Sequence, residues 1–277
     1  MGRRRELTGL RVLVTGASQG IGRAIVEVAA RRGMKVLAAA RNLELLIELA
    51  TQTKQVGGTV EIVQADVATE EGRRAMVEAA TQKFGGLDVL INNAGIGATG
   101  HFSESSPQVL RDIFETNFFG TVETTRAFLP LLCKGKMPAV INVSSILGRR
   151  AIPGRSLYSA SKFAIEGWTQ AIRAEFARFD IDVITINPGL TQTNFSQNML
   201  EKKAKLSLDH MRGMTAEDVA IATLNALAKG KNVVNLTFKG KILLFAARFL
   251  PGLVDRISRK KVRELFAAEI AERNKAA

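Results

Sequence analysis

The feature that most constrains the fold is a regular alternation of short apolar segments with longer segments of helical pattern. Several of the short segments are apolar throughout, as expected for strands that helices cover on both faces of a sheet. Seven segments have this strand pattern: residues 11–15, 35–40, 60–65, 87–92, 139–144, 182–187 and 232–238.

Helical patterns separate the strands, at about residues 21–32, 43–56, 70–84, 107–134, 158–178 and 215–228. The last of them has a start signal, with Thr215 as N-cap and Asp218 three residues later. The alternation predicts an α/β fold with a doubly wound, mostly parallel sheet in three layers, α/β/α. The sequence shows no repeat or linker, so we expect one catalytic domain over residues 1–238, followed by a basic helical extension over 239–277.

A glycine-rich loop follows the first strand and opens a helix, in the sequence VLVTGASQGIGRAI. Its glycines have the spacing G-x-x-x-G-x-G. Glycine allows a tight turn, a close approach of the backbone to a pyrophosphate and close packing of helix on strand. The free N–H groups at the start of the helix attract phosphate. The loop therefore predicts a dinucleotide site that includes Gly16, Ser18, Gln19, Gly20, Ile21 and Gly22.

The end of the second strand bears on the choice of cofactor. An enzyme that prefers NAD commonly has an acidic residue there, which binds the ribose 2′-hydroxyl, but this strand ends at Ala40 and Arg41. An arginine favours a 2′-phosphate, and the hydroxyl of Ser18 can bind the same group. We therefore expect NADP(H) in preference to NAD(H), with Arg41 and Asn42 in the cofactor site. The alternative is an ordinary surface arginine at a strand end.

Five short motifs occur in one order along the chain: TGASQGIG at 15–22, NNAG at 92–95, SS at 144–145, YSASK at 158–162 and NPG at 187–189. In their order and spacing, from about Leu7 to Val234, the chain resembles the short-chain dehydrogenase/reductase family. The resemblance implies a single Rossmann-like domain with a seven-stranded parallel sheet. That agrees with the seven strands expected from the apolar segments.

The resemblance also implies a catalytic group of four residues. Tyr158 corresponds to the acid/base, Lys162 to its partner and Ser145 to the hydroxyl that binds the substrate carbonyl. Ser145 is preferred to Ser144 because it lies thirteen residues before Tyr158, the spacing usual in the family. Asn117 corresponds to the residue that closes a proton-relay network, and its alternative is a polar residue inside a helix.

The remaining cofactor contacts follow from the same resemblance. Asp66 and Val67 correspond to the pair that holds the adenine, with Asp66 on the exocyclic amine; a plain turn aspartate is the alternative. The segments that correspond to the contacts with the riboses and with the carboxamide of nicotinamide comprise Asn93, Ala94, Gly95, Pro188, Gly189, Thr191 and Thr193. Thr191 departs from the aliphatic residue that many relatives have at that position.

Elementary chemistry supports the role of the YSASK motif. Tyr158 and Lys162 are four residues apart, so a helix places both side chains on one face. The pKa of free tyrosine is about 10, and carbonyl reduction at neutral pH requires a proton donor closer to the working pH. An ammonium group and an oxidised nicotinamide both favour the phenolate, so we expect the pKa of Tyr158 to be lowered. Outside this context the two side chains would be an ordinary helix-surface pair.

The segment after Pro188 is expected to form a lid, because ligands of open α/β sheets bind outside the carboxyl ends of the strands. Its larger apolar side chains are Phe195, Met199, Leu200 and Met211. They suggest a lipophilic small-molecule substrate, a carbonyl compound or an alcohol. The alternative is that they only pack the lid onto the core.

The tail from about Phe238 combines apolar runs with many basic residues. Residues 229–277 hold twelve of the 39 Lys and Arg residues and four of the 26 Asp and Glu residues. Pro251 is expected to divide the tail into two helices. The tail resembles the C-terminal extension of membrane-associated members of the family, and a basic amphipathic helix can lie in a lipid interface. Alternatively, its apolar face covers a neighbouring subunit or the substrate entrance.

The composition and the N-terminal sequence argue against several other kinds of site and location. Cys133 is the only cysteine and there are two histidines, so we expect neither a disulfide nor a Cys/His metal centre. The N-terminus lacks the pattern of a secretory signal and no segment reaches the length of a membrane span. We therefore expect a cytoplasmic protein. The net charge of +13 lies chiefly in the tail and is the only feature that suits nucleic acid, which we do not expect as a partner.

The leading hypothesis is an NADPH-dependent carbonyl reductase. One alternative is a 3-oxoacyl-[acyl-carrier-protein] reductase, whose acidic protein partner would suit the basic tail. Another is an NADPH-binding sensor or scaffold without turnover, against which the presence of Ser145, Tyr158 and Lys162 argues. The family resemblance implies pairing through the helices at 107–134 and 158–178, so we expect a homodimer or homotetramer.

Overall fold

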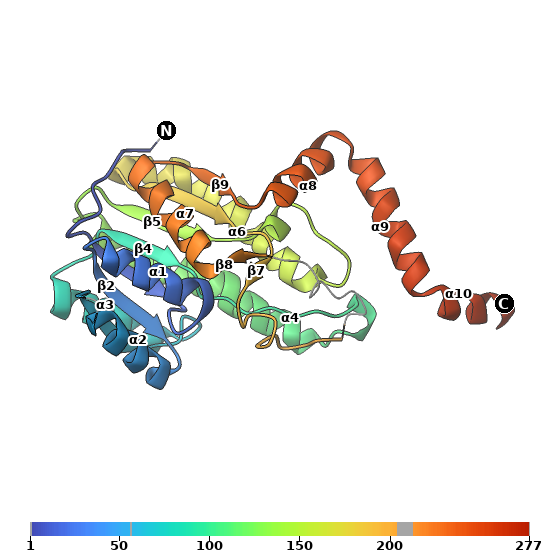
Figure 1. Ribbon diagram of the computed structural model, residues 1–277, viewed down its shortest axis with the longest axis horizontal. Helices are drawn as coiled ribbons and strands as arrows, with labels where there is room; N and C mark the ends of the chain where they lie inside the picture. The colour runs from blue at the N-terminus through green and yellow to red at the C-terminus, as the bar shows by residue number, and fades with distance from the viewer. Residues whose placement is uncertain (1, 56, 204–212, 277) are drawn as a thin grey trace.

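The centre of the molecule is a seven-stranded parallel sheet with the strand order β3-β2-β1-β4-β5-β6-β9 (Figure 1). The computed structural model describes residues 2–55, 57–203 and 213–276. The expected doubly wound α/β fold is confirmed. The strands are β1 (Arg11–Thr15), β2 (Lys35–Ala40), β3 (Val60–Gln64), β4 (Val89–Asn92), β5 (Ala139–Val143), β6 (Asp182–Asn187) and β9 (Val233–Asn235).

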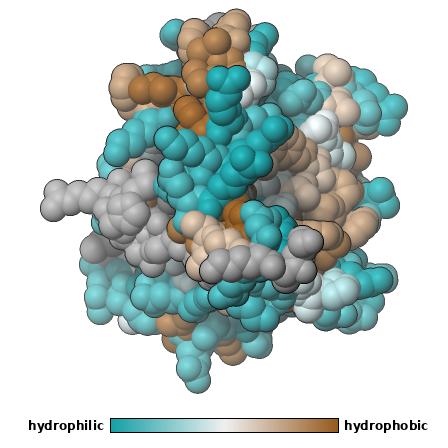
Figure 2. Space-filling model, turned by 90° about the vertical axis from the view of Figure 1, so that its right-hand side faces the viewer, coloured by the Kyte–Doolittle hydropathy of each residue, from teal (hydrophilic) through white to brown (hydrophobic). Residues whose placement is uncertain are grey.

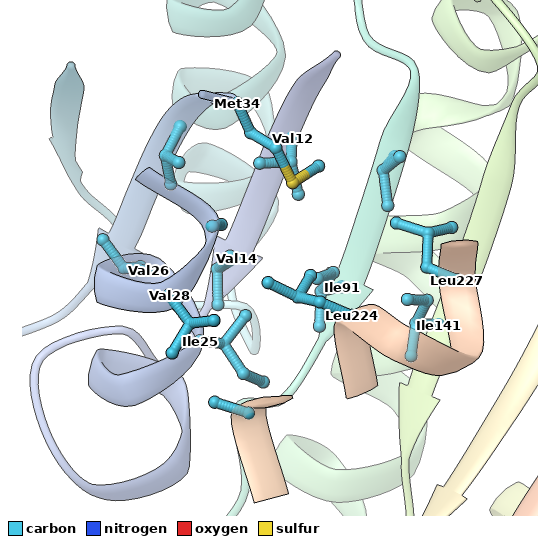
Figure 3. Close-up of a cluster of buried hydrophobic side chains, with 14 of the residues drawn as sticks. Val12, Val14, Ile25, Val26, Val28, Met34, Ile91, Ile141, Leu224 and Leu227 are labelled. Carbon is cyan, nitrogen blue, oxygen red and sulfur yellow. The ribbon is translucent and has the colours of Figure 1, made fainter. Parts of the chain in front are cut away.

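Helices cover both faces of the sheet. Side chains that alternate along each strand reach opposite faces, so Val12 and Val14 join one core cluster while Leu13 joins the other. Figure 3 shows Val12 and Val14 in the first cluster, together with Ile25 and Leu224. The first cluster is covered by α1 (Gly20–Arg31), α2 (Leu43–Gln55) and α7 (Ala216–Lys229), and the second by α3 (Glu70–Phe84), α5 (Gly120–Leu132) and α6 (Ser156–Glu175).

The ends of several elements differ from the sequence-based expectation. β4 begins at Val89 rather than at residue 87, and β9 covers three residues rather than seven. A second, two-stranded parallel sheet of β7 (Thr191–Gln192) and β8 (Met214–Thr215) was not expected, because two-residue strands have no detectable pattern. The expected start of α7 is confirmed, since the side chains of Thr215 and Asp218 form a complete capping box.

The prediction of a single regular helix at 107–134 is wrong. This segment consists of α4 (Pro107–Phe114), a π-helical turn over Glu115–Phe119, and α5. The side chain of Asn117 in this turn bonds to the backbone of Ile96, and a side chain at Gly120 would collide with Val67. Such turns are frequent at functional sites. Tertiary contacts, which the periodicity does not record, therefore distort the helix here.

The tail leaves the body of the protein as a chain of three helices: α8 (Phe238–Phe249), α9 (Pro251–Leu265) and α10 (Ala267–Ala276) (Figure 1). The expected break at Pro251 is confirmed, but a second break at Phe266 makes three helices instead of two. Arg150 holds α9 through an ion pair with Asp255 at 2.6 Å. In the part of the chain that the structure describes, no helix is long and apolar enough to cross a membrane.

A partly buried ion pair joins the starts of β1 and β4. Two guanidinium nitrogens of Arg11 bond the carboxylate of Asp88 at 2.7 and 2.9 Å, and the backbone N–H groups of Arg11 and Lys136 also donate to it. Burial alone would raise the pKa of Asp88, but these hydrogen bonds and the charge of Arg11 outweigh it, so the pKa is lowered. The ionised carboxylate therefore stabilises the sheet.

The variant Asp88→Asn tests this stabilisation. Because the folded-state pKa is lower than the unfolded one, the contribution is present above the unfolded pKa of about 3.9 and is lost as pH falls through the folded value. We expect the variant to lose about 3 kcal/mol of unfolding free energy at pH 7, and the difference from wild type to shrink on acidification. Urea unfolding at a series of pH values measures it. Glu78→Gln, at an exposed ion pair, is the control with little effect. An Asp88→Asn deficit that is independent of pH would contradict the assignment.

Candidate active site

One large cavity, of about 1570 Å³, lies at the carboxyl ends of the strands. It collects residues from both halves of the chain, from the glycine loop to the start of α8. Of the residues expected in the site, Gly22 and Asn117 are outside its lining and all the others line it. Those others are Gly16, Ser18, Gln19, Gly20, Ile21, Arg41, Asn42, Asp66, Val67, Asn93, Ala94, Gly95, Ser145, Tyr158, Lys162, Pro188, Gly189, Thr191 and Thr193.

The glycine loop is held against β4 by backbone contacts. A Cβ atom at Gly22 would lie 2.2 Å from the carbonyl oxygen of Gly16, so only glycine fits there. The amide of Asn93 donates to the carbonyl oxygens of Thr15 and Gly16. The hydroxyl of Thr15, a residue that the motif reading did not single out, accepts bonds from the N–H groups of Asn93 and Ala94. Gly22 therefore supports the loop from behind rather than lining the cavity.

The loop leads directly into the N-terminus of α1. This helix begins at Gly20. It has no side-chain cap and no acidic residue in its first turn. Its first backbone N–H groups therefore carry the positive end of the helix dipole, and no acidic residue of the first turn opposes an anion there. Such an end of a helix suits a phosphate group.

Arg41 and Asp66 lie next to each other at the ends of β2 and β3. Arg41 Nη1 is 3.8 Å from Asp66 Oδ2, and the Arg41 side chain is 68% exposed. The other carboxylate oxygen of Asp66 accepts the N–H of Ala68, which closes the turn after β3. An exposed arginine in a long, loose ion pair can exchange its partner for a phosphate at small cost.

Tyr158 and Lys162 lie one turn apart on α6, as the spacing predicts. Lys162 is buried, and its ammonium lies 5.8 Å from the centre of the Tyr158 ring and donates to the carbonyl oxygen of Val143 at 3.0 Å. Burial lowers the pKa of Lys162 to about 8, against the opposing charge of Glu166. The ammonium therefore remains largely protonated at neutral pH.

The expected lowering of the Tyr158 pKa is wrong for the protein by itself. Burial raises the pKa of this phenol to about 12, although the hydrogen bond with Ser145 and the charge of Arg155 act in the opposite direction. The spacing of Tyr158 and Lys162 indicates that they meet, but it carries no information about the loss of hydration around the phenol. The buried phenol thus keeps its proton at neutral pH.

The structure separates the two adjacent serines. Ser145 forms the hydrogen bond with Tyr158 and accepts the N–H of Leu147 at 3.1 Å. Ser144 also borders the cavity, but it is only 4% exposed and its hydroxyl faces the buried Glu166. Ser145 rather than Ser144 is therefore the hydroxyl beside Tyr158.

Asn117 connects three segments around the cavity. Its side chain accepts the N–H of Ile96 at 2.8 Å, donates to the carbonyl of Ile96 at 3.0 Å and donates to Ser161 at 3.0 Å. Ser161 in turn donates to the carbonyl of Tyr158. The sequence did not single out Ser161 for this contact, and only its place within YSASK hinted at it. The amide of Asn117 is thus used to hold the loop after β4 against α6.

The expected lid is confirmed only in part. The ring of Phe195 lies 5.8 Å from that of Tyr158, and Met199 lines the cavity near Arg155. Leu200 is 45% exposed and is outside the cavity lining, and Met211 lies outside the described residues. Residues around the start of the tail, whose place the sequence did not predict, complete the wall: Thr237, Phe238, Lys239, Gly240 and Leu243.

No group of three or more potential ligands for a metal ion occurs among the residues that the structure describes. The cavity instead combines a glycine loop at one end with a serine, a tyrosine and a lysine at the other. This arrangement, on a doubly wound sheet, has the features of a dinucleotide-binding oxidoreductase.

The sequence model of the short chain dehydrogenase family matches residues 11–204. The chain belongs to this family of oxidoreductases. It is similar to the mouse dehydrogenase/reductase SDR family member 7B, with 35% identity over 91% of this chain and 81% of the relative. It is also similar to the ketoacyl reductase HetN of a Nostoc species, with 31% identity over 91% of this chain and 89% of the relative.

Solved structures give the same fold. A short chain dehydrogenase from Burkholderia cenocepacia, solved in complex with NADP, has a TM-score of 0.76 and 30% identity over 90% of this chain and 97% of its own. A family member from Burkholderia phymatum, in complex with NAD, has a TM-score of 0.82 over 90% of this chain and 96% of its own. At 24% identity, the second likeness concerns the fold alone.

The single tyrosine of the chain allows a direct test of the burial at Tyr158. A phenolate absorbance titration of the protein without cofactor should give a midpoint near 12, because burial disfavours the charged form. The same chain unfolded in denaturant should titrate near the free value of about 10. A midpoint at or below 10 in the folded protein would show that the phenol is hydrated.

Proposed function

We propose that the protein is an NADP(H)-dependent oxidoreductase that interconverts a lipophilic ketone or aldehyde with its alcohol. The observation that carries the proposal is the meeting of Ser145, Tyr158 and Lys162 in the cavity that also contains the glycine loop. The glycine loop and the group of Ser145, Tyr158 and Lys162 would both belong to one catalytic domain, residues 1–238.

The chain's own residues would position the carbonyl and supply a proton. Ser145 would donate a hydrogen bond to the carbonyl oxygen and hold it beside the phenol of Tyr158, which would give its proton to that oxygen. The nicotinamide, when bound, supplies or accepts the hydride. The ammonium of Lys162 and the positive charge of an oxidised nicotinamide would lower the pKa of Tyr158 from its raised value, which allows the reverse transfer to proceed as well.

The glycine loop and the N-terminus of α1 would hold the pyrophosphate of the cofactor. Arg41, Ser18 and Asn42 would hold the 2′-phosphate of NADP, while Asp66 and Val67 flank the adenine. The related structure with NADP, at 30% identity, supports a nicotinamide cofactor in general. The preference for NADP rests on the exposed arginine at the end of β2.

Two alternatives remain in competition with this function. A 3-oxoacyl-[acyl-carrier-protein] reductase is supported by the name of the Nostoc relative and by the basic tail, which would suit an acidic protein partner. Substitution of the tail arginines should then raise KM for the protein-bound substrate and spare free ketones. A cofactor-binding sensor would bind NADPH without turnover, and the intact Ser145, Tyr158 and Lys162 argue against it.

The assembly and location of the protein are also proposals. We propose a cytoplasmic homodimer or homotetramer that pairs through α4, α5 and α6, as the family resemblance implies. We further propose that the tail makes peripheral contact with a membrane. Exposed apolar side chains on α8 and α9, such as Phe245 and Leu253, support the contact.

The variant Tyr158→Phe tests the reaction. It should lower kcat by about 10²- to 10⁴-fold, because the phenyl ring has no proton to donate, while NADPH affinity stays within a few-fold of wild type. NADPH oxidation against a panel of ketones and aldehydes measures turnover, and cofactor titration measures affinity. Turnover of no carbonyl by the wild type, with tight NADPH binding, would favour the sensor.

The variant Arg41→Ala tests the cofactor preference. Loss of a charge-assisted contact with the 2′-phosphate should weaken NADPH binding about tenfold or more and leave NADH binding nearly unchanged. Dissociation constants of both cofactors for both proteins measure the effect. Lys35→Ala, at the exposed opposite end of β2, removes the same charge away from the site. An equal loss for NADPH and NADH with Arg41→Ala would contradict the assignment.

A further inference from the structure

A second cavity, of about 1300 Å³, lies between the tail and the body of the protein, separate from the candidate active site. Its walls come from the loop after β5, from Phe163 of α6 and from the facing sides of α8 and α9. Arginines gather in it. Among the described residues, the basic members of the lining are Arg149, Arg150, Arg248, Arg259 and Arg263, and the one acidic member is Asp255.

Three of these arginines form no close ion pair with the described residues, although the charge of Arg259 also acts on Asp255. Arg150 bonds Asp255 at 2.6 Å, and Arg149 lies 3.8 Å from the buried Glu166. Arg248, Arg259 and Arg263 have no carboxylate of the described residues within 4.0 Å. The cavity therefore holds an excess of positive charge that the described part of the chain does not neutralise.

Apart from Asn235 and Ser258, the rest of the lining is apolar. Ile152, Leu244, Phe245, Phe249 and Val262 face the cavity between the arginines, and the rings of Phe245 and Phe249 lie 4.6 Å apart. A small inorganic anion would make no favourable contact with these apolar side chains. A ligand that satisfies both kinds of lining has an anionic group joined to a hydrocarbon part.

An exposed apolar band continues from the rim of this cavity along α8 and the start of α9. Figure 2, which faces the tail, shows brown apolar side chains at the top of the molecule, where Figure 1 places the bend between α8 and α9. Each of these side chains is at least half exposed: Phe238, Ile242, Phe245, Phe249, Leu250, Leu253 and Ile257. A band of this kind is suited to the acyl region of a lipid surface.

The arginine-lined cavity and the apolar band lie side by side, and from this juxtaposition we propose that the cavity binds the phosphate headgroup of an anionic phospholipid while the band enters the bilayer. A second copy of the chain fits less well, because each copy has a net charge of +13 and would bring the same arginines to the contact. The inference deepens the membrane contact proposed above and rests on it. It adds a discrete site with a ligand class.

The site is tested with the full-length protein and two kinds of vesicle, phosphatidylcholine alone and phosphatidylcholine with phosphatidic acid. Arg259→Gln with Arg263→Gln removes two arginines from the cavity. Arg256→Gln with Lys261→Gln removes the same charge from residues of α9 that are outside the lining. We expect flotation with phosphatidic acid to fall at least tenfold more for the cavity pair than for the control pair.

A charge-conserving pair separates a shaped site from general attraction. Lysine keeps the charge of arginine but lacks its planar fork for phosphate. Arg259→Lys with Arg263→Lys should therefore weaken flotation about tenfold, whereas Arg256→Lys should not change it. Circular dichroism and NADPH-dependent turnover of a soluble carbonyl check that every variant is folded.

Three results would overturn the proposal. Equal losses of flotation for the cavity pair and the control pair would show that general surface charge, not the cavity, causes the membrane binding. Release of the wild type from vesicles by inorganic phosphate would identify a soluble anion as the ligand. Failure of the wild type to float with either kind of vesicle would remove the membrane contact itself, while turnover of the soluble carbonyl remains an independent measure of the proposed reaction.

Discussion

The contact between the ends of β1 and β4 organises the site. The amide of Asn93 reaches back to the carbonyl oxygens of Thr15 and Gly16, and Gly22 leaves room for it. At this point the strand order changes direction, so the connections leave the sheet on opposite sides and open a crevice between them. The glycine loop and the segment Asn93–Gly95 can face a common cavity because this contact holds their backbones together. Ser145, which follows β5, and Tyr158 and Lys162 of α6 then join the cavity at the same edge of the sheet.

Much of the fold was predictable because its central strands are buried on both faces, which leaves an apolar pattern that few other structures share. The motif spacing also predicted which residues meet, as Tyr158 and Lys162 do on α6. What escaped prediction depends on contacts between distant segments. The π-helical turn at Asn117 follows from bonds to Ile96, and the role of Ser161 follows from the same amide. Neither contact leaves a local signal.

The pKa of Tyr158 is a second property that the sequence spacing did not predict. The pair of a tyrosine and a lysine one turn apart suggests attraction between the phenolate and the ammonium. In the structure Lys162 bonds a backbone carbonyl and the loss of water around the phenol dominates, so the shift has the opposite sign. In the proposed reaction Tyr158 would be a neutral acid, and the positive charge of an oxidised nicotinamide would act with Lys162 to lower its raised pKa. The proposed reaction would therefore couple the pKa of Tyr158 to the redox state of the cofactor.

The helix α8 lies between the two cavities and contributes residues to the lining of each. Leu243 lines the candidate active site and the next residue, Leu244, lines the arginine-rich cavity, while Ile152 borders both. Two sites that share a helix obey thermodynamic reciprocity: if occupation of one site changes the affinity of the other by some factor, the reverse effect has the same size. A lipid that favours substrate binding would thus be held more tightly by the substrate-loaded protein. Enzyme with substrate would then concentrate at the surface where a lipophilic substrate is dissolved.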